Sequence, residues 1–334
     1  MRERPAGLDD AEVISALAAM WAIDVERTEY LPVGAGSYHW SMVDRDGTAW
    51  FVKVDDLGVE DGERDHTYDR LTRSLGAALA LQRDAELTFV LAPIPTRSGA
   101  VLSRLTSRYA VSVYPMVAGA AGEFGLHRRA DRTELVDLLA SLHMATPAVA
   151  DIAVRADLVL PGRDRLQEAL RDLGREWTGG PYAESARKLL ATNAESVEGW
   201  LADFDRLVDG VRDAGTAWVV THGEPHPGNV MRTPAGLRLI DWDTVQVAPP
   251  ERDLWMLTDA FAGMLGEDPA GADDEVLVRY ADATGHSAKP GVIALYPLWW
   301  KLADIAIDVD ALRRPHVADA DRAASLRYLT NYLS

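Results

Sequence analysis

Residues 221–229 read THGEPHPGN, and residues 239–243, shortly after them, read LIDWD. This pattern predicts an apolar strand over 217–221 that runs into a polar loop rich in Pro and Gly, and a second strand over 237–240 that ends in an acid. We expect the two strands to pair with each other. The loop and the terminal acid would then meet at one end of a strand pair.

Three side chains of this stretch carry the chemistry. Pairing of the strands would bring together Glu224, Asn229 and Asp241. The oxygens of Asn and Asp are hard ligands of the kind that Mg²⁺ prefers, and Mg²⁺ takes further oxygens from phosphates. A third residue nearby can position a hydroxyl for in-line attack on a phosphoryl group. The stretch therefore predicts a phosphoryl-transfer site.

Other interpretations of the stretch have less support. His222 and His226 have the spacing of a helical zinc pair, but Pro225 and Pro227 exclude a helix there. The loop could also be a purely structural Pro/Gly turn, and Asp241 by itself could be a helix cap or a surface acid. The sequence has no GxSxG motif, so hydrolysis by a Ser/His/Asp triad has little support.

A lysine lies in the middle of a predicted strand, in WFVKV at 50–54. Lysine is rare in this chain: Lys53 is one of four lysines among 34 basic residues. It could be a solvent-facing strand residue. The functional interpretation is a point charge that reaches the phosphate oxygens of a nucleotide, which makes Lys53 a candidate catalytic residue.

A glycine-rich turn, VGAGS at 33–37, precedes this strand. Lys53 follows Gly36 by 17 residues, the span of a strand, a turn and a return strand. Gly34 and Gly36 would let backbone N–H groups approach phosphates closely, and Ser37 completes the turn. A plain hairpin turn is the alternative for this segment.

The hydrophobic pattern predicts an α+β chain in two parts. Residues 1–113 are predicted to form a small antiparallel-sheet lobe, 114–125 a Pro/Ala/Gly-rich hinge, and 126–334 a larger, mostly helical lobe. The first part has predicted helices over 8–22 and 64–82, and predicted strands over 28–33, 37–44, 48–54, 87–91, 100–105 and 109–113. The second part has predicted helices over 131–146, 163–176, 183–213, 251–265, 273–284, 292–312 and 319–333.

Composition excludes several classes of function. The 334 residues carry a net charge of −18, which disfavours nucleic acid and anionic membrane as partners. The absence of cysteine removes disulfides and thiolate zinc sites. Neither an apolar leader nor a stretch long enough to span a membrane is apparent, so we expect a cytoplasmic protein. Composition does not determine the oligomeric state.

Taken in order, these motifs resemble those of the aminoglycoside phosphotransferase family, small-molecule kinases with a protein-kinase-like two-lobed fold. The resemblance covers most of the chain, at residues 34–37, 53, 114–119, 222–229 and 241–243. Two further segments, APPERDL at 248–254 and ADIA at 303–306, resemble the spectinomycin-phosphorylating branch in particular.

The resemblance implies a role for each matching position. Lys53 would hold the α- and β-phosphates of the nucleotide, and Asn229 and Asp241 would bind Mg²⁺. Asp243 matches a second acid beside the metal ligand, and Asp253 matches a buried acid that braces the catalytic loop. The backbone groups implied to pair with adenine belong to Tyr114, Pro115, Met116 and Val117. The residues do not distinguish ATP from GTP.

The chain departs from the family pattern in three ways. Glu224 stands where the family usually has Asp, a third loop glycine is missing, and the acidic partner of Lys53 is open among Glu63, Asp65 and Asp69. Glutamate reaches about 1.5 Å further than aspartate, and a misplacement of about 1 Å can lower a rate roughly 100-fold. Pro225 directly after it can reshape the loop. Our hypothesis is that Glu224 orients the acceptor hydroxyl and receives its proton late.

Candidates for the acceptor site lie towards the C-terminus: Glu251, Glu267, Asp268, Trp299, Trp300, Asp304 and Asp308. Asp304 and Asp308 are four residues apart and share a predicted helix face with Trp300, which suits an ammonium-bearing sugar or cyclitol. The alternative is a tryptophan in the core beside a solvated acidic face. An acidic chain agrees with a cationic substrate.

The sequence therefore predicts an ATP- and Mg²⁺-dependent O-phosphotransferase that acts on a cationic aminoglycoside or aminocyclitol antibiotic and gives resistance or self-protection. One alternative is a metabolic small-molecule kinase that acts on choline, homoserine or a sugar. Another is a nucleotide-binding pseudokinase in which Glu224 marks lost catalysis. Retention of Lys53, Asn229 and Asp241 argues against the pseudokinase.

Overall fold

The structure is a computed structural model that describes residues 4–5, 7–34, 36–58, 61–213, 215, 217–268 and 273–333. Ala35, in the middle of the glycine-rich turn, lies outside the described residues. The chain divides into two compact units. The first comprises Met1–Arg155, Trp218–Met256 and Asp282–Gly285, and the second comprises Ala156–Ala217, Leu257–Ala281 and His286–Ser334. The hinge predicted at 114–125 lies inside the first unit, so the division into lobes about that hinge stays a prediction.

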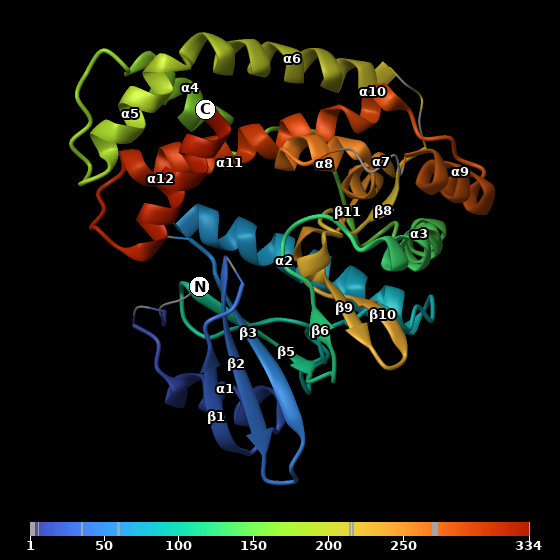
Figure 1. The fold of residues 1–334 in the computed structure, drawn as a ribbon. Helices are drawn as coiled ribbons and strands as arrows, with labels where there is room; N and C mark the ends of the chain where they lie inside the picture. The colour runs from blue at the N-terminus through green and yellow to red at the C-terminus, as the bar shows by residue number, and fades with distance from the viewer. Residues whose placement is uncertain are drawn as a thin grey trace. The chain divides into compact units, whose positions relative to one another are not determined.

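A five-stranded antiparallel sheet begins the first unit, and Figure 1 shows its longer strands side by side. Its order is β1 (Val25–Leu31), β2 (Ser37–Asp44), β3 (Ala49–Asp56), β5 (Tyr109–Pro115) and β4 (Ser103–Arg104). The alternating pattern that predicted the first three strands is confirmed, since alternate side chains of a strand face opposite sides of the sheet.

One face of this sheet is apolar and forms a core with α1 (Asp10–Trp21). Asp9 caps this helix and accepts a hydrogen bond from the Glu12 amide. Leu17 of the helix, Trp40 of β2 and Val52 of β3 are completely buried in that core. The opposite face is polar. It is the face that carries Lys53.

Residues 87–91 do not form the predicted strand. Here Val90 makes one isolated bridge to Leu239, and two backbone hydrogen bonds join residues 89–91 to Leu239. Pro93 and Pro95 follow, and proline has no N–H to extend a ladder. The segment comes after α2 (Asp61–Arg83) and leads to the short strand β4.

Two small sheets complete the first unit, and they correct the predicted strand pair. β8 (Val219–Thr221) lies beside β11 (Gln246–Ala248), which also pairs with β7 (Val154–Arg155). β10 (Gly236–Leu239) pairs instead with β9 (Val230–Thr233), which pairs with β6 (Ala120–Ala121). The two predicted strands therefore do not pair with each other, because the chain after the loop turns back as a short hairpin. Besides α1 and α2, the first unit contains α3 (Arg129–Met144) and α7 (Glu251–Leu254).

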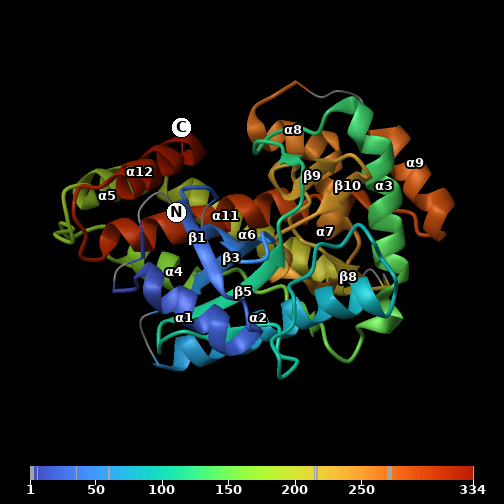
Figure 2. The same cartoon turned by 90° about the horizontal axis from the view of Figure 1, so that it is seen from below.

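The second unit is helical. It contains α4 (Arg163–Arg171), α5 (Ala183–Thr192), α6 (Ala194–Asp213), α8 (Asp259–Leu265), most of α9 (Asp273–Thr284), α10 (Pro290–Ile293), α11 (Leu295–Arg313) and α12 (Ala320–Leu333). The central helix is α11, which contacts α4, α5, α6 and α12. It lies beside α12 in both Figure 1 and Figure 2.

Several predicted helices are interrupted or shorter than expected. The helix predicted over 183–213 is two helices, because Asn193 ends the first, where its side-chain amide donates to the Leu189 carbonyl. The helix predicted over 292–312 is broken before α11, whose first turn contains Pro297 and so lacks one backbone donor. A 3₁₀ turn at Trp255–Leu257 interrupts the helix predicted over 251–265, and α4 ends five residues before the predicted end at residue 176.

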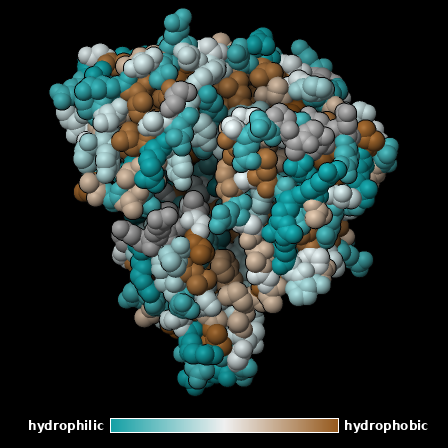
Figure 3. Space-filling view, viewed as in Figure 1, coloured by the Kyte–Doolittle hydropathy of each residue, from teal (hydrophilic) through white to brown (hydrophobic). Residues whose placement is uncertain are grey.

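The described helices are all too short or too polar to cross a bilayer. The face of the molecule drawn in Figure 3 is largely hydrophilic, with apolar residues in separate patches.

Candidate active site

Lys53 lies at the centre of the polar sheet face, 4% exposed. Its Nζ is 2.6 Å from Asp241 Oδ1, 3.1 Å from Asp243 Oδ2 and 3.5 Å from Asp55 Oδ1. Burial by itself lowers the pKa of this ammonium group, but the three carboxylates outweigh burial and raise the pKa well above its usual value. Lys53 is therefore a fixed positive charge.

Asp241 reaches Lys53 because of the backbone that precedes it. The Ile240 amide donates to the Asn229 carbonyl at 3.0 Å, which joins the end of β10 to the end of the 222–229 loop. Asp241 itself has a φ of +64°, the left-handed conformation that is strained for a residue other than glycine. Burial raises the pKa of its carboxyl, but Lys53 lowers the pKa by more than burial raises it, so the pKa lies below its ordinary value.

The 222–229 loop is braced from beneath by a buried acid. Asp253 is completely buried and accepts hydrogen bonds from the His222 amide (2.9 Å), the Gly223 amide (2.6 Å) and His143 Nε2 (2.9 Å). Burial raises its pKa, but the hydrogen bond from His143 and the nearby charges lower it more, and the carboxyl stays ionised at neutral pH. The predicted brace is confirmed.

Gly223 is required by a close neighbour. It has a φ of +100°, and a Cβ there would collide with the Arg252 guanidinium. Arg252 in turn donates to Thr221 Oγ1 (2.8 Å) and to the Thr244 carbonyl (2.9 Å), which ties the loop to the segment after Asp241. His222 donates to the Ile240 carbonyl through Nε2 at 2.9 Å. The His-Gly pair thus has a structural purpose.

The segment that contains Glu224 is held by hydrogen bonds to two of its backbone carbonyls. Asn229 Nδ2 donates to the Glu224 carbonyl at 3.0 Å, and His127 Nε2 donates to the Pro225 carbonyl at 2.8 Å. The Asn229 amide is thereby oriented with its nitrogen towards the loop. Its Oδ1 accepts no hydrogen bond from any residue that the structure describes, so it can serve as a ligand.

The residues fit a divalent cation that is shared with phosphate. Three carboxylates surround one ammonium group, which leaves an excess of negative charge, and the Ile240 amide joins the Asn229 backbone to the residue just before Asp241. Within the described residues, no three His, Asp or Glu side chains are placed to hold a metal ion by themselves. Mg²⁺ typically takes one or two carboxylates and completes its shell with water and phosphate oxygens.

The glycine-rich turn has the conformation that requires glycine. Gly34 and Gly36 have φ values of +70° and +84°. His39 supports the turn: its ring interacts with the Val33 carbonyl (Nδ1, 3.0 Å) and the Ser37 hydroxyl (Nε2, 3.3 Å) and stacks on Phe51 at 5.1 Å. Burial lowers the pKa of His39 to about 4, which keeps the ring neutral. The Ser37 hydroxyl thus faces His39.

The segment predicted to pair with adenine follows the end of β5. Tyr114 is buried, with its ring 6.4 Å from that of Phe51. The Met116 amide already donates to the Ala49 carbonyl at 3.1 Å, and Pro115 has no N–H. The Val117 amide forms no hydrogen bond to a described residue, which leaves it as the donor for a base among these four. Adenine pairing itself stays a prediction.

The three α2 acids considered for Lys53 do not bind it. In the described part of the chain, the carboxylates within 4.0 Å of its Nζ are those of Asp55, Asp241 and Asp243. Asp65 pairs with Arg104 at 2.6 Å instead. Glu63 and Asp69 are exposed on α2. The predicted ion pair to the helix is therefore wrong, because alternation along β3 places Asp55 on the same face as Lys53 and within 4.0 Å of its Nζ.

The acceptor candidates are divided between the units. Glu251, in the first unit, is completely buried, which argues against direct contact with an acceptor. Trp300, Asp304 and Asp308 lie on α11 in the second unit. Tyr332 of α12 donates to Asp304 Oδ2 at 2.7 Å.

The two acids of α11 are not on a fully solvated face. Asp308 is 7% exposed, and burial raises its pKa to about 7. Burial also raises the pKa of Asp304. A cation placed beside them would favour their ionised forms.

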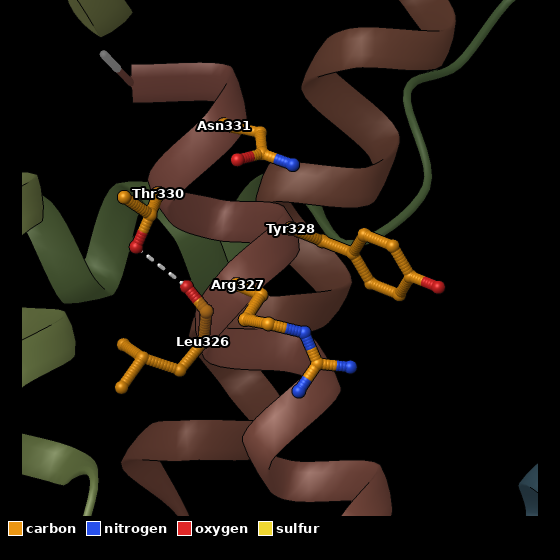
Figure 4. A pocket seen from close by; sticks show the side chains of 5 residues that line it. All are labelled: Leu326, Arg327, Tyr328, Thr330 and Asn331. Carbon is orange, nitrogen blue, oxygen red and sulfur yellow. Dashed lines mark hydrogen bonds between the residues drawn. The ribbon is translucent and has the colours of Figure 1, made fainter.

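The structure also has a shallow hollow on α12. Figure 4 shows that its lining residues all come from that one helix, with Thr330 donating to the Leu326 carbonyl at 2.7 Å. Its residues are Leu326, Arg327, Tyr328, Thr330 and Asn331. None of the residues predicted for the site lines it, and we assign it no role.

Comparison with known proteins identifies the family. The profile of the phosphotransferase enzyme family matches residues 29–296, most of the chain. The chain belongs to this family. It is accordingly a small-molecule kinase, a phosphotransferase with an alcohol group as acceptor.

Among its relatives, this phosphotransferase is 29% identical over 316 residues to Protein StrN of Streptomyces griseus, covering 91% of this chain and 86% of that protein. Solved structures share the kinase-like fold at lower identity. Spectinomycin phosphotransferase APH(9)-Ia, in complex with ADP and spectinomycin, matches with a TM-score of 0.73 at 16% identity, covering 97% of this chain and 94% of that one. Choline kinase LicA from Streptococcus pneumoniae matches with a TM-score of 0.57 at 16% identity, covering 97% and 98%.

Sequence reasoning missed several supporting residues of this phosphotransferase. They are His39, Asp55, His127, His143 and Arg252. The two glycines beside His39 and Arg252 were a usable signal, because an obligatory glycine indicates that another group approaches closely. Asp55 had a local signal, because it follows Lys53 by two residues at the end of a predicted strand and so shares its face. His127 and His143 had no comparable signal, since their partners lie far away in the sequence.

Proposed function

We propose that the protein transfers the γ-phosphoryl group of ATP, with Mg²⁺, to a hydroxyl of a cationic aminoglycoside or aminocyclitol and so gives resistance or self-protection. The observation that carries this proposal is the contact of Lys53 with Asp241, at 2.6 Å across 188 residues of sequence. A buried lysine and a strained acid have little structural reason to meet, whereas a nucleotide phosphate with its metal needs both.

The residues divide the work. Lys53 would hold the α- and β-phosphates, and the turn with Gly34 and Gly36 would present N–H groups to them. Asn229 Oδ1 and the Asp241 carboxylate would hold Mg²⁺, which when bound neutralises charge on the phosphate oxygens. Solved relatives in the fold are described with ADP, with AMP, and with AMP-PNP and Ca²⁺, which supports a nucleotide here.

Glu224 would orient the acceptor hydroxyl and take up its proton. The carbonyls of Glu224 and Pro225 are both held by hydrogen bonds, so the longer side chain starts from a fixed backbone. Such positioning supports a competent enzyme over a pseudokinase, because a carboxylate that orients a hydroxyl must start from a fixed point.

The acceptor class is supported by charge. Asp304, with Trp300 on the same helix, would offer a carboxylate and an aromatic ring to an ammonium group, and the buried Asp308 would act on it only through its charge. The net charge of −18 favours a cationic substrate as well. A choline-, homoserine- or sugar-type acceptor is the alternative that the assay below decides.

The test is phosphoryl transfer by the purified protein with ATP and Mg²⁺ against a panel of aminocyclitols, aminoglycosides, choline, homoserine and neutral sugars, read as a mass shift. We expect turnover with a cationic cyclitol or aminoglycoside. Glu224→Gln should lower kcat about 100- to 10,000-fold, whereas Glu198→Gln, on the exposed surface of α6, should match the wild type. Turnover confined to choline, homoserine or sugars would refute the acceptor class. No turnover with any acceptor would support the pseudokinase, and unchanged turnover in Glu224→Gln would refute its role.

A further inference from the structure

The buried cation of the site has a counter-charge on its own strand. We infer that Asp55 of β3, and not an acid of α2, is the residue that positions Lys53 for the nucleotide. This inference rests on the proposed function, because it assigns a positioning residue to the same site. It follows from the place of Asp55 in the sheet, from the contacts of α2, and from what a phosphate would change.

The sheet holds Asp55 and Lys53 together. They are two residues apart on β3, so their side chains project from the same face. The strand is paired on both sides, with Asp55 opposite Ser37 of β2 and Ala110 of β5. Both side chains are buried, with 6% exposure for Asp55, and the charged atoms lie 3.5 Å apart. The paired strand fixes both Cα positions, so only a change of side-chain rotamer can separate the two groups.

One oxygen of Asp55 remains without a hydrogen-bond partner. Its Oδ2 is buried and receives no hydrogen bond from the residues that the structure describes. A buried carboxylate in that state is unfavourable unless a nearby cation compensates it. Lys53 is the cation within 4.0 Å. Asp55 therefore has no evident structural purpose other than its interaction with Lys53.

The α2 helix is attached to the site in a different way. Arg70 donates to the Asp243 carbonyl at 2.9 Å, and Ser74 donates to the Val245 carbonyl at 3.4 Å. These bonds connect the helix to the backbone after Asp241. The acids on the exposed side of the helix do not contribute to them, and Asp65 is occupied by Arg104.

Once a nucleotide binds, Lys53 needs a carboxylate partner that does not move. Lys53 now contacts Asp241 and Asp243, which lie on a segment outside the sheet. When Lys53 contacts phosphate and Asp241 contacts a metal, the Lys53–Asp241 contact must lengthen or be shared. Asp55 stays in place because β3 does, and it keeps the ammonium group at the same point of the sheet in both states.

The experiment compares Asp55→Asn with three variants of α2: Glu63→Gln, Asp65→Asn and Asp69→Asn. Nucleotide affinity is measured by calorimetry with Mg²⁺-ATP, without an acceptor, and kcat is measured wherever turnover is found. We expect Asp55→Asn to weaken nucleotide binding about 10-fold or more, and the helix variants to stay within about two-fold of the wild type. An unchanged affinity in Asp55→Asn, or an equal loss in a helix variant, would overturn the inference.

A double-mutant cycle with Lys53→Met separates positioning from stability. If Asp55 acts through Lys53, adding Asp55→Asn to Lys53→Met should weaken nucleotide binding no further; independent losses that multiply would overturn the inference. Urea unfolding of each variant identifies any that fail to fold, and Asp55→Glu then replaces Asp55→Asn and should retain more affinity than Asp55→Ala. A wild type that binds nucleotide but phosphorylates nothing would refute the proposed function and leave this affinity test intact.

Discussion

The loop at 222–229 and the glycine-rich turn at 33–37, which we propose to serve the same reaction, are held in opposite ways. Asp253 and His127 fix the loop from beneath, through buried hydrogen bonds to its backbone. The turn is exposed at Val33, Gly34 and Gly36, and His39 supports it from the sheet.

The difference follows from what each segment must do. In the proposed function, the loop would place side-chain oxygens at the reacting centre, where an error of about 1 Å lowers the rate greatly. The turn would offer backbone N–H groups to phosphates, and these can adapt as the ligand enters. Changes beneath the loop should therefore affect folding and catalysis together, while changes beneath the turn should affect nucleotide binding alone.

The largest effect should come from Asp253→Ala. This variant leaves His143 and two loop amides without their buried acceptor. Removal of one partner from a buried charged network lowers the free energy of unfolding by about 3–5 kcal/mol, and phosphoryl transfer should be lost. Urea unfolding and steady-state kinetics measure both. Asp209→Ala, at an exposed position on α6, is the matched control. Wild-type stability in Asp253→Ala would show that the loop is not held from beneath.

An intermediate effect should come from His127→Gln, which keeps a donor for the Pro225 carbonyl but cannot titrate. Burial lowers the pKa of His127 from 6.5 to about 4. As the pH falls below 6.5, the unfolded chain takes up a proton before the folded chain does, so stability is lost between pH 6.5 and pH 4.

Urea unfolding at pH 7.5 and pH 5 should show that the wild type loses about 2 kcal/mol more than His127→Gln over this interval. His66→Gln, at an exposed position of α2, is the matched control. Equal losses in the wild type and His127→Gln would show that His127 is not held neutral beneath the loop.

The smallest effect should come from His39→Ala, beneath the turn. Loss of the ring removes its interaction with the Val33 carbonyl and the stacking on Phe51. The KM for ATP should rise about three- to ten-fold, roughly 1 kcal/mol, while kcat stays nearly unchanged. The KM of His39→Gln should lie between those of the wild type and His39→Ala. A ten-fold fall in kcat would show that the turn needs the same precision as the loop, and the contrast between them would disappear.

Local pattern was enough to predict much of this molecule. Alternation of apolar and polar residues indicated β1, β2 and β3, and the rarity of lysine singled out Lys53. The sequence predicted that Asn229 and Asp241 would lie near one another, although through a strand pair that the structure does not have. Instead, the Ile240 amide, just before Asp241, donates to the Asn229 carbonyl.

Sequence by itself determined the α+β class and the set of candidate site residues with their order, because residue type and short-range periodicity encode these directly. Tertiary structure alone decided that β8 pairs with β11, that Asp243 contacts Lys53 and that His127 supports the loop. Such choices depend on strand register and on contacts between distant segments. No local pattern records them, since a one-residue shift in register would exchange every partner across the sheet.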